Sequence, residues 1–197
     1  MYMATKRARL FASRKPFRWT RAHLEHLPDD GNRYEVLDGK LLVTPQASVP
    51  HQWIALELMM ALHPYCKAHR LGMPLGPGAV IFKKNELQPD VLVVPNFKGP
   101  VPDKWQNLPR PHLVIEVLSR TTTYRDFVIK REAYLKLGIA AYWVIDRFER
   151  NAAIWTQASD EPEMVTDAIR WQPREEIPPL KIPLSALFAA LEAPQPD

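Results

Sequence analysis

The chain has 197 residues, of which 46% are hydrophobic and 24% are charged. This composition is typical of folded globular proteins and excludes fibrous and disordered classes. The net charge of +4 is compatible with a nucleic-acid partner but does not require one. The single cysteine, Cys66, excludes a disulfide framework and a cysteine-rich zinc site, and it favours a cytoplasmic protein. No apolar run approaches the roughly 20 residues that cross a bilayer, so we expect no membrane partner.

Charge and proline content divide the chain into three predicted segments. Residues 1–18 form a basic N-terminal arm that we expect to be flexible, residues 19–191 form a single domain, and residues 192–197 form a tail. No clean apolar run follows the basic residues, so the arm does not resemble a signal peptide. It is either a disordered leader or a contact to nucleic acid, and composition does not separate the two.

The first half of the domain predicts a β-hairpin and a long helix. A short helix begins after Thr20, and Asp38-Gly39 is a strong hairpin signal between strands over 33–37 and 40–44. Apolar residues then recur at steps of three and four, which predicts a helix over 51–69 with a broad apolar face. The two series are Trp53, Leu56, Met60 and His63, and Ile54, Leu58 and Leu62.

The second half alternates apolar runs with one helical segment. Short strands are predicted over 79–83, 91–94, 113–118, 141–146 and 152–156, with helices over 125–137 and 184–191. The unbroken apolar run at 113–118 is typical of a central strand that is covered on both faces. Strand, helix and strand in succession predict a βαβ unit. The fold class is therefore α/β or mixed α+β, with an N-terminal hairpin and a mixed central sheet flanked by helices.

Two acidic residues lie where a core disfavours them. Asp90 precedes the run 91–94, and Glu116 lies inside the run 113–118. A lone buried carboxylate costs several kcal/mol unless it is paired or binds a cation, and two neighbouring carboxylates repel each other. A divalent cation between them removes both costs, and oxygen ligands favour Mg²⁺, Mn²⁺ or Ca²⁺ over zinc. The alternative is that each carboxylate forms a salt bridge with a nearby Arg or Lys.

The helix after Glu116 carries Asp126 and Lys130, which are four residues apart and share one face. A crossover helix packs on its own sheet, so this face can meet the ends of the strands. Lys130 would then place an attacking water or offset negative charge. The alternative is an ordinary exposed ion pair between the two residues.

These residues, in this order and spacing, resemble the Uma2 family, which is described as a family of restriction endonucleases within the PD-(D/E)XK nuclease superfamily. The resemblance runs from about residue 33 to 155 and is carried by the segments 34–39, 88–90, 114–119 and 142–146 together with His51, Asp126 and Lys130.

The resemblance implies a restriction-endonuclease-like fold and a site in which Asp90, Glu116 and the backbone carbonyl of Val117 hold Mg²⁺ or Mn²⁺. The superfamily's lysine normally stands two positions after the glutamate, where this chain has Leu118. In Uma2-like proteins the lysine is displaced to the next helix, and Lys130 matches that place.

The resemblance also implies roles for four further residues. Glu35 matches the family's early glutamate, as a metal ligand or a group that orients one, although pairing with Arg33 or Lys40 is an alternative. His51 either contacts the site or caps the long helix. Gln88 and Ser119 flank the two acids and could bind substrate or ligand water, and a turn explains Ser119 almost as well.

The function implied is a metal-dependent endonuclease that hydrolyses phosphodiester bonds in DNA. Two active sites are needed to cut both strands together, so we expect a homodimer. Two alternatives stay open: a nucleic-acid-binding descendant of the fold that no longer cuts, and a metal-dependent phosphoesterase that acts on small molecules.

Overall fold

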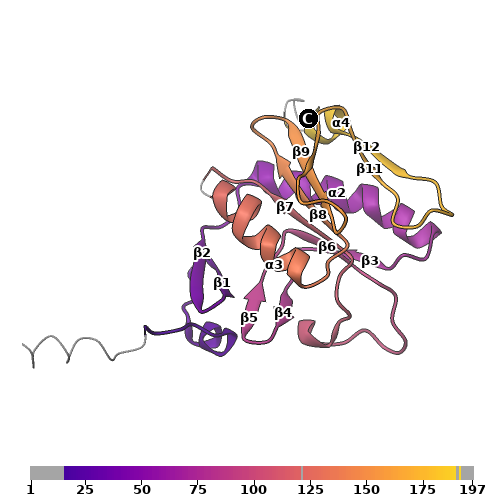
Figure 1. Ribbon diagram of the computed structural model, residues 1–197. Coiled ribbons are helices and arrows are strands. Elements are labelled where there is room, and N and C mark those ends of the chain that lie inside the picture. Colours follow the sequence, from indigo (N-terminus) through magenta and orange to yellow (C-terminus); the bar gives the residue numbers. More distant parts are fainter. Residues whose placement is uncertain (1–15, 121, 190, 192–197) are drawn as a thin grey trace, which may run out of the picture.

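A six-stranded mixed sheet forms the centre of the computed structural model (Figure 1). The structure describes residues 16–191 except 121 and 190. The strand order is β10-β9-β8-β7-β6-β3, and only β7 and β8 run parallel. The bounds are β3 Met73–Leu75, β6 Val91–Val94, β7 Leu113–Val117, β8 Ala141–Asp146, β9 Asn151–Thr156 and β10 Glu163–Val165. The parallel pair on either side of a helix confirms the predicted βαβ unit.

Two smaller sheets complete the strands. The first has the order β2-β1-β5-β4, and the second pairs β11 with β12. Their bounds are β1 Arg33–Leu37, β2 Lys40–Thr44, β4 Val80–Phe82, β5 Asn85–Leu87, β11 Ala168–Trp171 and β12 Leu180–Pro183. Asp38 and Gly39 both have positive φ, at 49° and 86°, which is the type I′ turn that matches the twist of a hairpin. The predicted hairpin is confirmed with the same bounds.

Helices cover both faces of the large sheet (Figure 1). Helix α2 packs on one face, and η3 with α3 packs on the other. The helical bounds are η1 Arg21–His26, α2 Val49–Ala68, η2 Trp105–Asn107, η3 Arg125–Lys130, α3 Arg131–Lys136 and α4 Leu184–Ala189. One helix was predicted over 125–137, but its first part, η3, is a π-helix.

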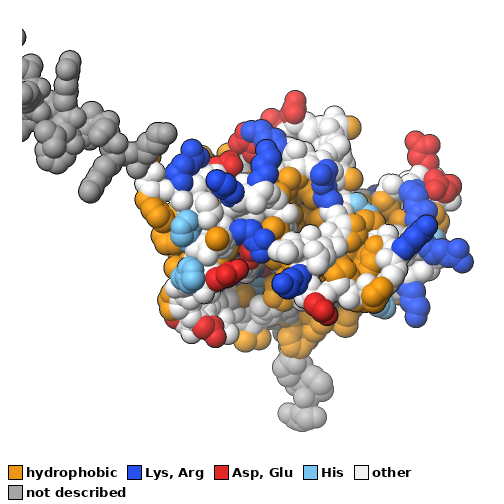
Figure 2. Space-filling model, turned by 90° about the horizontal axis from the view of Figure 1, so that it is seen from below, with side chains coloured by type: hydrophobic (Ala, Val, Ile, Leu, Met, Phe, Trp, Pro, Cys, Tyr) orange, Lys and Arg blue, Asp and Glu red, His pale blue; other side chains and the backbone are white. Residues whose placement is uncertain are grey.

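The face of α2 that enters the core is narrower than the sequence indicates. Ile54, Leu58 and Leu62 are buried, whereas Leu56 and Met60 are about half exposed. The prediction of a broad apolar face in the core is therefore wrong for the first series, which contains Leu56 and Met60, because the sheet covers only one side of the helix. Other hydrophobic side chains also remain exposed between Lys and Arg side chains (Figure 2).

The N-terminal arm was predicted over 1–18, and residues 1–15 lie outside the described residues, as does the predicted tail, 192–197. Arg18 lies against the hairpin turn, where its Nη2 donates to the carbonyl of Asp38 at 2.9 Å. None of the described helices combines the length and the apolar character needed to cross a membrane.

Candidate active site

The central sheet brings Asp90 next to Glu116. Strands β6 and β7 are antiparallel with Val91 opposite Ile115, so the residue before Val91 lies beside the residue after Ile115. The Val117 backbone N–H donates to Asp90 Oδ2 at 2.8 Å. Both carboxylates are buried. The register of two apolar strands therefore places both predicted acids in one buried cluster.

Asp90 is held by two cationic or titratable side chains from other elements. Arg33 in β1 donates from Nη1 to Asp90 Oδ1 at 2.8 Å and to the carbonyl of Gln88 at 3.0 Å. His51, in the first turn of α2, lies with Nε2 3.1 Å from Asp90 Oδ2. Ser48, not His51, is the N-cap residue of α2. Of the two interpretations of His51, the structure shows the contact with the site.

Lys130 joins three carboxylates inside the protein. Its Nζ lies 2.8 Å from Glu35 Oε1, 2.9 Å from Glu116 Oε1 and 3.8 Å from Asp126 Oδ1. Lys130 and Asp126 are both buried, so the alternative of an exposed ion pair is wrong. The π-helix η3 carries both residues inward because it packs on the sheet above β7.

Glu35 is fully buried on β1 and enters the same cluster. Its Oε1 accepts the backbone N–H of Gln88 at 2.7 Å as well as the Lys130 ammonium. The Gln88 side chain turns away and donates to the carbonyl of Tyr34 at 3.1 Å. Among the described residues Glu35 pairs with Lys130, and neither Arg33 nor Lys40 forms an ion pair with it.

A cavity of about 240 Å³ opens beside this cluster. Its wall includes Glu116, Val117 and Asp126, and Ser119 and Thr122 form part of the rim. The Ser119 hydroxyl bonds to Thr122 Oγ1 at 3.1 Å, so Ser119 holds a turn and faces the cavity at once. The cavity wall also contains Arg33, His51, Arg120 and Arg147, whereas Lys130 and Asp90 do not contribute to it.

The cluster carries more buried negative charge than its cations neutralise. Four carboxylates, of Glu35, Asp90, Glu116 and Asp126, are buried, and they meet two permanent cations, Arg33 and Lys130. Burial raises the pKa of Glu116 to about 8, with Lys130 opposing the shift and the neighbouring carboxylates adding to it. Burial also raises the pKa of Asp126.

The pKa of Asp90 moves in the opposite direction. Burial acts to raise it, but hydrogen bonding from His51 and the charge of Arg33 outweigh burial and hold it at about 2. Burial alone would lower the pKa of Lys130, yet the charges of Glu116 and Glu35 raise it, so the ammonium stays protonated. Asp90 therefore remains a carboxylate, and the excess charge falls on Glu116 and Asp126.

The donor set fits a hard divalent cation. No group of three or more His, Cys, Asp and Glu side chains within the described residues is arranged to hold a metal ion. Mg²⁺, however, commonly takes one or two carboxylates and keeps several waters. Within the described part of the chain, the hydrogen bonds from Lys130 and Tyr134 to Glu116 both end on Oε1, which leaves Oε2 for a ligand. Asp126 Oδ1 is buried without a hydrogen-bond partner among the described residues.

Sequence reasoning missed three contributors to the cluster. Tyr134 donates to Glu116 Oε1 at 3.2 Å, Arg33 binds Asp90, and Arg147 lines the cavity. Signals for two of them were present. Tyr134 is four residues after Lys130 on the same helical face, and Arg33 is two residues before Glu35 on the same strand face. Arg147 follows β8, and no spacing in the sequence indicates it.

Comparison with known proteins gives a family and similar solved structures. The Uma2 family, described as "Putative restriction endonuclease", matches residues 21–186. A solved structure described as "a putative nuclease belonging to DUF820" from Anabaena variabilis ATCC 29413 shares the fold, with a TM-score of 0.69 and 20% identity over 87% of this chain and 98% of that chain. No curated protein matches the chain. The chain belongs to the Uma2 family.

Proposed function

We propose that the protein is a divalent-cation-dependent nuclease that hydrolyses phosphodiester bonds in DNA at the cavity beside Glu116. The observation that carries the proposal is the charge of the cluster: four buried carboxylates against two permanent cations, next to a cavity with arginines in its wall. When Glu116 and Asp126 are ionised, a divalent cation offsets the two remaining negative charges, and a phosphate suits the arginines.

Asp90, Glu116 and the carbonyl of Val117 would hold Mg²⁺ or Mn²⁺. Asp90 Oδ1 accepts one hydrogen bond, from Arg33, and a carboxylate oxygen has two lone pairs, so it retains capacity for a cation. When bound, such a cation lowers the pKa of a coordinated water and polarises a phosphoryl oxygen.

The remaining residues position these ligands and the substrate. Lys130 and Tyr134 hold Glu116 Oε1, while His51 and Arg33 hold Asp90. Lys130 does not line the cavity, so its role is to orient Glu116 and to oppose the rise of its pKa rather than to place the attacking water.

Two arginines at the cavity suit flanking phosphates. The guanidinium groups of Arg120 and Arg147 lie 4.7 Å and 4.2 Å from the centre of the Phe148 ring, which fixes them at the wall. Contacts of this kind neutralise backbone phosphates, and the affinity for DNA should then fall steeply with salt. A homodimer with two such sites would cut both strands together.

Plasmid cleavage with a matched pair of variants tests the proposal. Glu116→Gln removes one buried carboxylate without changing its size, and Glu132→Gln makes the same change at an exposed position of α3. We expect wild type and Glu132→Gln to cut DNA with Mg²⁺ or Mn²⁺ and not with EDTA, and Glu116→Gln to be slower by roughly 100-fold. Equal cutting by both variants would indicate a contaminating nuclease and refute the proposal.

One observation favours a second candidate, a nucleic-acid-binding protein that does not cut. The Lys130 ammonium is buried between two carboxylates and does not line the cavity, unlike a lysine that acts on water. Gel-shift binding of DNA without cleavage in any divalent cation, together with loss of binding in Arg120→Gln, would support this candidate.

A further inference from the structure

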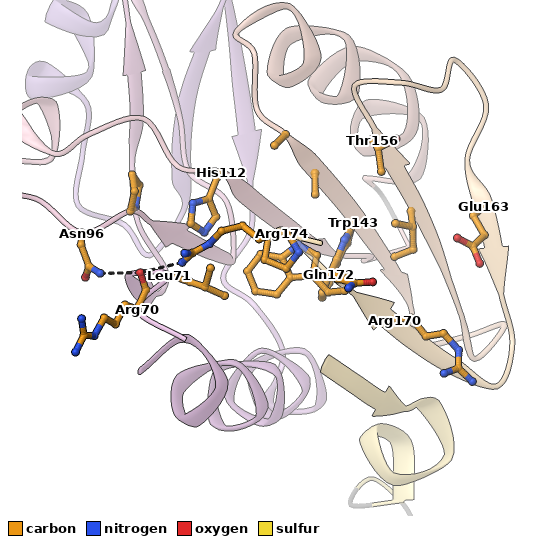
Figure 3. A pocket seen from close by; sticks show the side chains of 16 residues that line it. Arg70, Leu71, Asn96, His112, Trp143, Thr156, Glu163, Arg170, Gln172 and Arg174 are labelled. Atoms are coloured by element: carbon orange, nitrogen blue, oxygen red, sulfur yellow. Dashed lines mark hydrogen bonds between the residues drawn. The ribbon is translucent and has the colours of Figure 1, made fainter. Parts of the chain in front are cut away.

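A second cavity lies at the other end of the parallel strands (Figure 3). It has a volume of about 690 Å³, and His112, Ala141 and Trp143 at the starts of β7 and β8 line it. Four residues of extended chain, about 13 Å, separate His112 from Glu116. Trp143 packs with α2 on one face of the sheet, whereas the carboxylate cluster lies on the face that α3 covers. The second cavity is therefore separate from the candidate active site.

Aromatic rings form the floor of this cavity. The ring centres of His112 and Trp171 are 5.8 Å apart, and those of Trp143 and Trp171 are 6.0 Å apart at 88°. His112 Nε2 and Trp143 Nε1 are buried with no hydrogen-bond partner among the described residues. Buried polar groups of this kind are nearly always paired in proteins, so a bound ligand with hydrogen-bonding atoms would complete them.

Arginines dominate the charged part of the wall. Arg70, Arg170 and Arg174 line the cavity together with a single carboxylate, Glu163. Arg174 Nη2 donates to the carbonyls of His69 and Arg70 at 2.8 Å and 3.2 Å, which holds Arg174 beside Arg70. Figure 3 shows Arg170 and Glu163 at the opposite end. Arg174 Nη1 lies 4.0 Å from Glu176 Oε1, whereas the Arg70 guanidinium forms no ion pair with any described residue, so the unneutralised positive charge at this end of the cavity is that of Arg70.

We propose that this cavity binds a nucleotide, with the base against the aromatic floor and the phosphate at the Arg70 and Arg174 end. Guanidinium groups match phosphate oxygens in pairs, and aromatic rings accept a planar base. The volume lies within the range of about 300–1,000 Å³ that holds small ligands. A free nucleotide and an unpaired nucleotide in a strand present the same chemistry.

Calorimetry on the full chain in EDTA tests the proposal without requiring catalysis. The probes are adenosine 5′-monophosphate, adenosine, inorganic phosphate and a single-stranded adenylate hexamer. Arg70→Asn removes the free cation at a position with φ of 52°, which asparagine tolerates. Lys83→Asn is the matched control, because Lys83 is also an exposed cation with φ of 52°, in the turn between β4 and β5. Asp90→Asn reports on binding at the candidate active site instead.

The monophosphate should bind saturably, one per chain, and more tightly than adenosine or phosphate. We expect Arg70→Asn to weaken it about tenfold, as for loss of one charged hydrogen bond, and Lys83→Asn and Asp90→Asn to leave it unchanged. No saturable binding, equal affinity in Arg70→Asn, loss in Asp90→Asn, or phosphate binding as tightly as the monophosphate would each overturn the proposal. If Arg70→Asn weakens binding of the hexamer, the cavity accepts a nucleotide that is part of a strand. If Arg70→Asn leaves hexamer binding unchanged, the cavity accepts a free nucleotide.

Discussion

Replacing Lys130 with methionine tests whether the buried ammonium is required to hold the carboxylate cluster. Methionine keeps most of the side-chain volume but leaves Glu35, Glu116 and Asp126 without the cation that lies within 4 Å of all three. Removing one partner of a buried ion pair costs about 3–5 kcal/mol, because a buried charge remains uncompensated. In a domain of this size that corresponds to a fall of roughly 6–20 °C in melting temperature.

Differential scanning calorimetry of three variants measures the effect. Lys136→Met makes the same change on α3, where Lys136 pairs with Glu132 in solvent, so its melting temperature should match wild type. Adding Glu35→Gln to Lys130→Met removes one of the stranded charges and should restore part of the loss. If Lys130→Met melts at the same temperature as Lys136→Met, the carboxylates do not need the ammonium and the charge argument is wrong.

Three further predictions concern the rest of the fold. Burial raises the pKa of the Cys66 thiol to about 11, and the side chain is inaccessible to solvent. The native protein should therefore react with Ellman's reagent at pH 8 far more slowly than the urea-unfolded chain. Equal rates for the native and unfolded protein would contradict this prediction. Burial lowers the pKa of His112 below its usual 6.5, so the unfolded chain takes up the proton more readily, and stability should fall as pH drops below about 6.5. Urea unfolding of His112→Asn should show a smaller fall in stability over this pH range. An identical fall in the variant and the wild type would count against the assignment. Gly72 has φ of 123°, and a Cβ there would lie 1.9 Å from the Val94 carbonyl oxygen, whereas a Cβ at Gly99 would meet nothing within 4 Å. Gly72→Ala should therefore destabilise the protein clearly more than Gly99→Ala. Thermal melts that rank the two variants the other way would refute the packing argument.

Local patterns were enough to predict most of the strands. The bounds of β1, β2, β6 and β8 are those predicted, because each is a short apolar or alternating run bounded by turn residues. β3, β5 and the strands after β9 were missed. β3, β5 and β10 have three residues each, too few for a periodicity to be detected, and β3 pairs with β6, which lies further along the chain. Among the described strands, β11 and β12 pair only with each other.

The acidic residues of the candidate site could be predicted because charge inside an apolar run is conspicuous. Glu116 and Glu35 lie in strands and Asp90 directly precedes one, and alternation along a strand fixes which face each side chain occupies. Their cations were harder to place. Arg33 and Lys130 reach the cluster through long side chains from separate elements, and a flexible stem can point in several directions until tertiary packing selects one.

The π-helix η3 has a consequence for the angular placement of side chains. Asp126, Lys130 and Tyr134 are spaced by four residues, and in a regular α-helix each such step overshoots a full turn by about 40°. A π turn, with its i→i+5 hydrogen bonds, contains more residues than an α turn, so a step of four residues falls short of a full turn. The step through η3 and the step through α3 therefore deviate from a full turn in opposite directions. The three side chains thereby align more closely than a uniform helix allows. Deleting one residue between Asp126 and Lys130 would rotate everything before the deletion by somewhat less than about 90° relative to α3, and Asp126 would leave the cavity while Lys130 and Tyr134 stayed.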